Sequence, residues 1–323
     1  MITRRQFIVG ASAVLGTTMS PLAYSAKSVS SNRQKLKGGY VKVLAALPYI
    51  YAIEKGIFNK YGIDVENIEF GSSNDVITSA ITSQIDFVGA GATNAAIDAM
   101  TASGKILEIF TTNNYVRRDN NQSTDFLLAL PEFKTMESLR GQPIAFFPGS
   151  FGRMFAKLVL PHYGLTLDDI KYVEMAPGQW FSAIQSKSVK AVTALEPFAT
   201  KIMNSLPVNI LINGYYATVL QDVPGSGSWF IKDHLSKKTE QNIFMAMKES
   251  IEQIKNNRTE VNEVIEKVFG LDKNISNDVR MMDWGTSIET NNREMIIRFG
   301  SILEESGGIA RKLPRDNVWI WDY

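Results

Sequence analysis

The sequence is poor in the residues that most often carry enzyme or metal chemistry. Its 323 residues include no cysteine and only two histidines, His162 and His234, which lie far apart in the chain. Without cysteine there is no disulfide, no thiolate metal site, no iron–sulfur cluster and no cysteine nucleophile. Two isolated histidines leave little imidazole for metal binding or proton transfer. We therefore expect no metal site.

An excess of charge is also missing. Lysine and arginine total 34 and aspartate and glutamate total 33, which gives a net charge of +1 at pH 7. This balance argues against a protein that binds nucleic acid or an anionic membrane over a large surface. The chain contains no H-E-x-x-H, no G-x-S-x-G and no G-x-x-x-x-G-K-S/T segment. We expect no catalytic residues, no cofactor and no nucleic-acid partner.

The first residues resemble an export signal. Arg4 and Arg5 precede a weakly apolar run, Phe7–Met19, and small residues follow at positions 23–26. The run is shorter than the roughly 20 apolar residues that span a bilayer. The arginine pair favours a twin-arginine signal over a general-secretion signal, and an amphipathic helix or membrane anchor is the other alternative. Residues 1–26 are thus predicted to be a cleaved signal read by the twin-arginine export machinery.

The expected mature protein is soluble and periplasmic, because no cysteine stands at the predicted cleavage point to receive a lipid. Residues 27–39 hold almost no large apolar side chains and are predicted to be a flexible lead-in. From Tyr40 onward, short β-branched runs alternate with segments of helical periodicity. This alternation predicts an α/β fold with mostly parallel sheets flanked by helices. From Gln241 the chain is predicted to be mainly helical.

Helix starts are marked at two places by capping pairs. Ser72 with Asp75, and Thr166 with Asp169, have the spacing of a capping box.

Pro224–Ser228 is rich in glycine and serine and is interpreted as a hinge or a return loop. The aromatic tail, residues 317–323, is expected to pack on the body of the protein because of its large apolar area, with a frayed end as the alternative.

Four groups of residues, taken in their order along the chain, resemble a known family. They are Pro48-Tyr49, Ala52, Lys55-Gly56-Ile57-Phe58 and Tyr61-Gly62-Ile63-Asp64-Val65; Ser83-Gln84-Ile85-Asp86-Phe87 and Gly91; Leu139-Arg140-Gly141-Gln142-Pro143-Ile144-Ala145 and Gly149-Ser150; and Leu195-Glu196-Pro197. The family is the ABC-transporter substrate-binding proteins for nitrate, alkanesulfonates, taurine and thiamine-pyrimidine precursors. The resemblance covers roughly residues 40–230.

The resemblance implies a two-lobed type II periplasmic binding protein whose chain crosses twice between the lobes, with the ligand in the cleft. Residues 40–113 plus 223–323 are expected to form lobe one, and residues 114–222 lobe two. The implied function is capture of a small anionic organic molecule, sulfonate-like or related, for an inner-membrane ABC permease by a monomeric receptor. Delivery to a sensor or chemoreceptor is one alternative, and an exported enzyme on the same fold is another.

Small polar residues at predicted strand-to-helix junctions are the first candidates for ligand contact. Ser73 and Asn74, Thr93 and Asn94, and Ser150 all stand where helices are expected to begin. In parallel α/β lobes, ligands meet helix amino ends, which carry unpaired N–H groups and partial positive charge. Each of these residues is also a common helix cap. We expect several of them to converge on one cleft.

Larger side chains complete the predicted site. Arg153 is a candidate for bidentate binding of a sulfonate, carboxylate or nitrate, with a solvated first-turn arginine as the alternative. Glu196 is a candidate acceptor from the ligand, or a cap within lobe two. Aromatic candidates for stacking on an organic ligand, each of which is alternatively a core residue, are Tyr49, Phe151, Trp180 and Trp229. Lys190 departs from the aspartate common in the family, and the sequence does not explain it.

Overall fold

The computed structural model describes residues 33–115, 123–219 and 223–305, together with 309, 313 and 319–322. The predicted export signal, residues 1–26, lies outside the described residues. Among the helices of the described part, none combines the length and the apolar character needed to cross a membrane.

Strands and helices alternate through most of the described chain. The strands are β1 (Gln34–Val41), β2 (Ile63–Phe70), β3 (Phe87–Ala92), β4 (Leu107–Tyr115), β5 (Asp125–Ala129), β6 (Pro143–Phe146), β7 (Lys171–Glu174), β8 (Ala191–Leu195), β9 (Asn209–Asn213), β10 (Val223–Ile231) and β11 (Asp283–Thr286). The α-helices are α1 (Leu47–Glu54), α2 (Ile57–Lys60), α3 (Ser73–Ile81), α4 (Thr93–Ser103), α5 (Ser150–Val159), α6 (Trp180–Gln185), α7 (Phe198–Ser205), α8 (Lys237–Asn256), α9 (Arg258–Phe269), α10 (Lys273–Asp278) and α11 (Thr290–Glu305). Short 3-10 helices are η1 (Leu44–Ala46), η2 (Glu137–Leu139), η3 (Leu160–Tyr163), η4 (Leu167–Asp169) and η5 (Pro177–Gln179).

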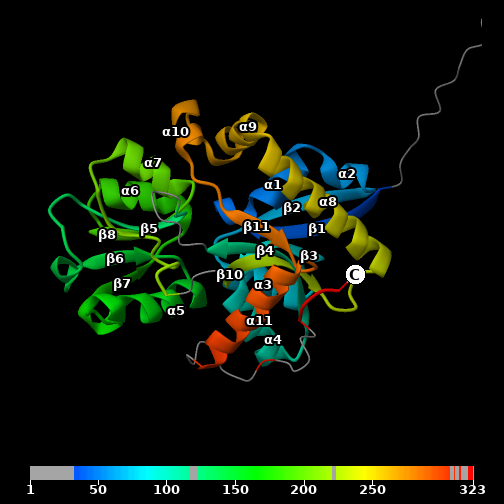
Figure 1. Cartoon of the computed structure of the whole chain (residues 1–323), viewed down its shortest axis with the longest axis horizontal. Helices are drawn as coiled ribbons and strands as arrows, with labels where there is room; N and C mark the ends of the chain where they lie inside the picture. The colour runs from blue at the N-terminus through cyan, green and yellow to red at the C-terminus, as the bar shows by residue number, and fades with distance from the viewer. Residues whose placement is uncertain are drawn as a thin grey trace, which may run out of the picture. The chain divides into compact units, whose positions relative to one another are not determined.

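The first lobe is built on a six-stranded sheet in the order β11-β4-β10-β3-β1-β2. Strand β1 is parallel to β2 and β3, whereas β10 is antiparallel to β3 and β4, and β11 to β4. Helices α1, α2, α8 and α9 lie on one side of this sheet, and α3, α4 and α11 lie on the other (Figure 1). Both faces of the sheet are therefore covered, as its largely buried strands require.

The second lobe is built on a five-stranded sheet in the order β7-β6-β8-β5-β9. Strand β6 is parallel to β7 and β8, and β5 is antiparallel to β8 and β9. The two-lobed α/β fold is confirmed, but both sheets are mixed rather than mostly parallel. The reason is that β10 and β5 enter their sheets from the other lobe instead of through a crossover helix on the same sheet.

The predicted lead-in, residues 27–39, is wrong for its last six residues. Strand β1 begins at Gln34, and most of it is buried. A Cβ on Gly38 would lie 2.4 Å from the Tyr49 hydroxyl, and one on Gly39 would lie 2.6 Å from Ile85 Cδ1. These glycines are required by close packing, although their composition resembles that of a flexible linker.

The prediction that Pro224–Ser228 is a return loop is wrong for the same reason. The segment is part of β10, which is buried along its whole length. A Cβ on Gly227 would lie 2.3 Å from the carbonyl oxygen of Thr111 on the neighbouring strand. Glycine here lets two strands approach each other.

Other local predictions are confirmed. The Ser72 hydroxyl accepts a hydrogen bond from the backbone N–H of Asp75 and caps α3, and Thr166 and Asp169 form a capping box. The aromatic tail packs on the body at Trp319 and Trp321, both fully buried. The Trp321 ring lies 4.7 Å from that of Phe244 on α8.

Candidate functional site

A small pocket lies where the two lobes meet. The first lobe contributes residues from β1, η1, α3, β3 and β10, and the second lobe contributes residues at the ends of β6 and β8 and from α5. Its lining residues are Val41, Val43, Ala45, Ser73, Ala90, Gly91, Ala92, Phe147, Phe151, Leu195 and Ser226. The cavity measures about 20 Å³. A single water molecule needs roughly 10–15 Å³ of such volume, so this conformation has room for about one water.

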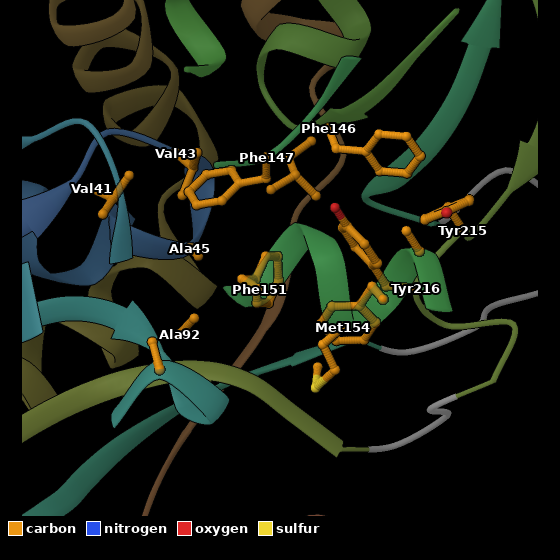
Figure 2. Packing of buried hydrophobic residues seen from close by; sticks show 14 of the residues in the cluster. Val41, Val43, Ala45, Ala92, Phe146, Phe147, Phe151, Met154, Tyr215 and Tyr216 are labelled. Carbon is orange, nitrogen blue, oxygen red and sulfur yellow. The ribbon is translucent and has the colours of Figure 1, made fainter. Parts of the chain in front are cut away.

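The walls of the pocket are mainly apolar. Phe147 and Phe151 extend from the second lobe toward Val43, Ala45 and Ala92 of the first lobe (Figure 2). The two phenylalanine rings meet edge to face with centroids 5.4 Å apart. Such surfaces favour an organic ligand over a bare inorganic ion.

Gly152 allows α5 to pack this closely against the end of β6. A Cβ at Gly152 would lie 2.0 Å from the Phe147 carbonyl oxygen. Any larger residue there would push Phe147 and Phe151 apart. The local sequence therefore sets the second-lobe wall of the pocket.

Two hydroxyl groups interrupt the apolar lining. The Ser73 hydroxyl accepts a hydrogen bond from the Ala92 backbone N–H at 3.1 Å, and the Ser226 hydroxyl accepts one from Asn113 Nδ2 at 3.0 Å. A hydroxyl that accepts through its oxygen still has its own hydrogen to donate. Ser73 and Ser226 are therefore suited to donate to an acceptor atom of a ligand.

Three helix starts meet beside the pocket. Asn74 Oδ1, in the first turn of α3, accepts from the Ser150 backbone N–H at 3.1 Å and from the Ser150 hydroxyl at 3.3 Å. Asn94 Nδ2, in the first turn of α4, donates to Ser150 Oγ at 3.4 Å. Ser150 opens α5, so these bonds join the two lobes. Helix amino ends carry partial positive charge, and three of them together favour an anionic or acceptor group.

Of the predicted polar candidates, Ser73, Asn74, Asn94 and Ser150 are thus brought together at the lobe interface. Thr93 stands beside them, but its hydroxyl donates to the Pro224 carbonyl oxygen at 2.8 Å, which ties α4 to β10. Of the predicted aromatic candidates, Phe151 lines the pocket.

Tyr49, Trp180 and Trp229 are not brought to the pocket. All three are fully buried, Tyr49 in the core between the first-lobe sheet and α1, α2, α8 and α9. The Trp180 indole donates to the Met175 carbonyl oxygen at 2.9 Å, and the Trp229 indole to that of Gly91 at 3.5 Å. Each large ring lies in a core because burial of its area stabilises the lobe that contains it.

Arg153 lies at the surface instead of in the pocket. Its side chain is 54% exposed, Nη2 lies 3.2 Å from Glu174 Oε1, and the guanidinium sits 4.8 Å from the centre of the Tyr172 ring. Both partners belong to the edge strand β7. The structure thus favours the alternative of a solvated first-turn arginine. Lys190 is also occupied locally, since its ammonium donates to the Lys187 carbonyl oxygen at 2.9 Å.

Glu196 lies at the lobe interface but outside the pocket lining. Its side chain accepts from the Thr200 hydroxyl at 2.7 Å and from the Thr200 N–H at 3.1 Å, which caps α7. Two first-lobe N–H groups also reach it: Leu44 N–H donates to its carbonyl oxygen at 2.9 Å, and Arg280 N–H to Oε1 at 3.4 Å. Burial raises the pKa of Glu196 to about 7. The predicted capping alternative matches these contacts.

Sequence reasoning missed Phe147 and Ser226. Phe147 ends an apolar strand and resembles any core residue. Ser226 lies in a stretch that resembles a loop, and only its position between two glycines signals a strand in close contact with its neighbours.

In the described residues, no group of three or more histidine, aspartate or glutamate side chains is arranged to hold a metal ion.

Comparison with known proteins gives a match to one family model. The model described as NMT1/THI5 like matches residues 45–267, which is more than half of the chain. Among curated proteins, candidate binding proteins of Brucella abortus (strain 2308) and Brucella suis biovar 1 (strain 1330) are each 29% identical over 158 residues. These matches cover 48% of this chain and 46% of each relative, so the chain spans about half the length of those relatives.

Solved structures with the same fold are more distant in sequence. The alkanesulfonate-binding protein SsuA of Xanthomonas axonopodis pv. citri, bound to MOPS, has a TM-score of 0.71 at 14% identity, covering 87% of this chain and 96% of that one. The periplasmic aliphatic sulphonate binding protein SsuA of Escherichia coli has a TM-score of 0.67 at 17% identity, covering 90% and 92%. The periplasmic nitrate-binding protein NrtA of Synechocystis PCC 6803 has a TM-score of 0.62 at 15% identity, covering 77% and 69%.

Proposed function

Because the chain belongs to the NMT1/THI5-like family, we propose that it is a solute-binding protein of an ABC importer. The protein captures a small anionic organic molecule between its lobes and delivers it unchanged to an inner-membrane permease. The observation that carries this proposal is the meeting of three helix starts beside an apolar pocket at the lobe interface. The names of the structural neighbours, which bind sulfonates and nitrate, support the same class of function.

The lining of the pocket sharpens the class of ligand. Among the lining residues that the structure describes there is no arginine or lysine, so we infer that hydroxyl and N–H donors hold the head group. A sulfonate or a carboxylate, whose charge is spread over several oxygens, suits such donors. Phe147, Phe151 and the aliphatic side chains opposite them accommodate an apolar body.

Binding requires the lobes to move. Pockets that hold organic ligands measure roughly 300–1,000 Å³, whereas the cavity in this conformation measures about 20 Å³. The ligand therefore enters a more open state, and closure around it shifts the population toward a bound, closed form. No step of this cycle requires a bond in the ligand to break, so we propose a receptor and not an enzyme.

We further propose that the protein works as a monomer in the periplasm. The arginine pair and weakly apolar run within residues 1–26 support export through the twin-arginine machinery, followed by removal of the signal. Import through a permease requires a receptor on the outer side of the inner membrane, and periplasmic location satisfies that requirement.

A thermal-shift screen of the purified protein tests the function. The panel contains taurine and other alkanesulfonates, MOPS, nitrate, and aliphatic and aromatic carboxylates. A ligand present at a hundred times its dissociation constant adds about 2.7 kcal/mol to the stability of the folded state. We expect an organic anion to raise the melting temperature and to be recovered unchanged by mass spectrometry.

Ser73→Ala identifies the site once a ligand is found. Loss of one hydroxyl donor is expected to weaken binding about tenfold, while Ser79→Ala, the same change on the same helix but away from the pocket, leaves affinity unchanged. A consumed ligand would show an enzyme instead of a receptor. Absence of any stabilising compound in the panel would refute the proposed ligand class.

A further inference from the structure

Asn74 makes hydrogen bonds to the other lobe. These bonds are not needed to cap the helix in which Asn74 lies. Ser72 already caps α3, since its hydroxyl accepts from the Asp75 N–H. Asn74, two residues further on, directs its carboxamide oxygen to the second lobe. That oxygen accepts from both the N–H and the hydroxyl of Ser150, at 3.1 Å and 3.3 Å.

Gly149 makes this approach possible. Its φ angle of +82° lies in a region that favours glycine. A Cβ at this position would lie only 2.2 Å from Asn74 Oδ1. The residue before α5 thus leaves space for the Asn74 oxygen at the point where the helix begins.

The groups that Asn74 occupies are those that an anionic ligand would use. The N–H groups of the first helical turn have no acceptor within the helix, and the helix dipole adds partial positive charge there. Ser150 presents such an N–H together with its hydroxyl. Its neighbour Phe151, and Ser73 next to Asn74, both line the pocket.

The conformation that contains these bonds leaves little room for an organic molecule, since its cavity measures about 20 Å³. A bond that stabilises such a conformation lowers the fraction of protein that is competent to bind. Apparent affinity falls in proportion to that fraction. The bonds between Asn74 and Ser150 therefore oppose ligand binding.

We propose that Asn74 is the affinity-determining residue of the site, because its carboxamide oxygen competes with the acceptor group of the ligand for the hydrogen-bond donors of Ser150. This inference rests on the proposed binding function and deepens it. Removal of the oxygen frees the donors and favours the open lobes, so Asn74→Ala binds an organic anion more tightly than the wild type. Asn74→Asp keeps the size, strengthens the bond to Ser150, repels an anion and binds it more weakly.

The first experiment needs no ligand. Hydrogen exchange at the Ser150 amide is measured in the wild type, in Asn74→Ala and in Asn204→Ala. Asn204 is a matched control, since its Nδ2 also bonds to the other lobe, at 2.8 Å from Asp278 Oδ2, but away from the pocket. We expect exchange at Ser150 to rise severalfold only in Asn74→Ala. Exchange equal to that of the wild type would overturn the proposal. Asn74 is exposed, so the substitution leaves the lobes folded.

The second experiment measures dissociation constants by calorimetry, with MOPS as the sulfonate probe and benzoate as the carboxylate probe. Freeing two donors corresponds to about a threefold to tenfold gain in affinity for Asn74→Ala. Asn204→Ala is expected to bind as the wild type does. Equal or weaker binding by Asn74→Ala, or an equal gain in Asn204→Ala, would overturn the role of Asn74 while leaving the receptor function intact. If neither probe binds any of the proteins, the proposed ligand class fails, and the exchange experiment alone decides whether Asn74 holds Ser150.

Discussion

In the first lobe, Glu108 and Glu240 are buried beside lysines. Glu108 Oε1 lies 3.6 Å from Lys232 Nζ, and Glu240 Oε2 lies 2.9 Å from Lys237 Nζ. Burial raises the pKa of Glu108, while the nearby lysines act in the opposite direction. The first lobe thus compensates its buried acids with cations held at its surface.

In the second lobe, Asp125 and Glu196 are buried without a lysine or arginine ion pair within 4 Å in the described residues. Asp125 accepts from the Tyr216 N–H, and Glu196 accepts from the hydroxyl and N–H of Thr200. Burial raises the pKa of each carboxyl to about 7, from 3.8 for Asp125 and from 4.5 for Glu196. The comparison shows that a buried acid without a paired cation makes stability depend on pH near neutrality.

The raised pKa values of Asp125 and Glu196 determine whether stability rises or falls with pH. A carboxyl with a higher pKa in the folded state holds its proton more tightly there than in the unfolded chain. Its stabilising contribution is fully present below about pH 4 and is lost as the pH rises through about 7. The second lobe should therefore be more stable at pH 5 than at pH 8.

Asp125→Asn is expected to have the largest effect. The amide removes a buried charge at pH 8, and the difference of about three pKa units corresponds to an upper bound of about 4 kcal/mol. We expect a gain of about 3 kcal/mol in the free energy of unfolding at pH 8 and less than half of that gain at pH 5, measured by urea denaturation. Asp168→Asn, at an exposed position, serves as the control. An equal effect at both pH values would contradict the explanation.

Glu196→Gln should act in the same direction but less strongly. Arg280 and Arg258 both exert a Coulombic influence on this carboxyl, and Arg280 lowers its pKa slightly, so its ionisation is less costly than that of Asp125. We expect a gain of about 2 kcal/mol at pH 8 by the same measurement. Glu263→Gln is the exposed control. Loss of stability at pH 8 would show that the charge of Glu196 is compensated after all.

Lys237→Met should have the smallest effect and the opposite sign. Removal of the ammonium leaves Glu240 buried without its cation, but Lys237 itself is largely exposed, so water offsets part of the loss. A loss of about 1 kcal/mol is expected at pH 8. Lys238→Met, at the neighbouring exposed lysine, should leave the free energy of unfolding unchanged. If Lys237→Met raised the free energy of unfolding, the buried acids of the first lobe would not be compensated by their lysines, and the two lobes would not differ in this respect.

The local parts of the fold could be predicted because each depends on a few adjacent residues. Ser72 and Asp75 mark a helix start by spacing alone, and so do Thr166 and Asp169. Gly38, Gly39 and Gly227 could not be interpreted in this way. Glycine is common both in flexible linkers and in tightly packed strands, and only the neighbouring chain distinguishes the two.

The site was predictable in part for the same reason. Strand-to-helix junctions are visible in the sequence, so Ser73, Asn74 and Ser150 could be chosen as candidates. Whether an aromatic side chain enters a core or a pocket depends on which face of its element meets another element. Tyr49 and Phe151 occupy similar local positions, yet Tyr49 packs over Gly89 in the first-lobe core and Phe151 extends to the other lobe.

The sequence by itself determined the alternation of strands and helices, the caps that begin them, the family and the absence of cysteine chemistry. These properties follow from residue types and from spacings of a few residues. The tertiary structure decided which of the candidate side chains face one another. Residues as distant as Asn74 and Ser150, or Leu44 and Glu196, come into contact only when two lobes are placed together, and no local pattern records such a contact.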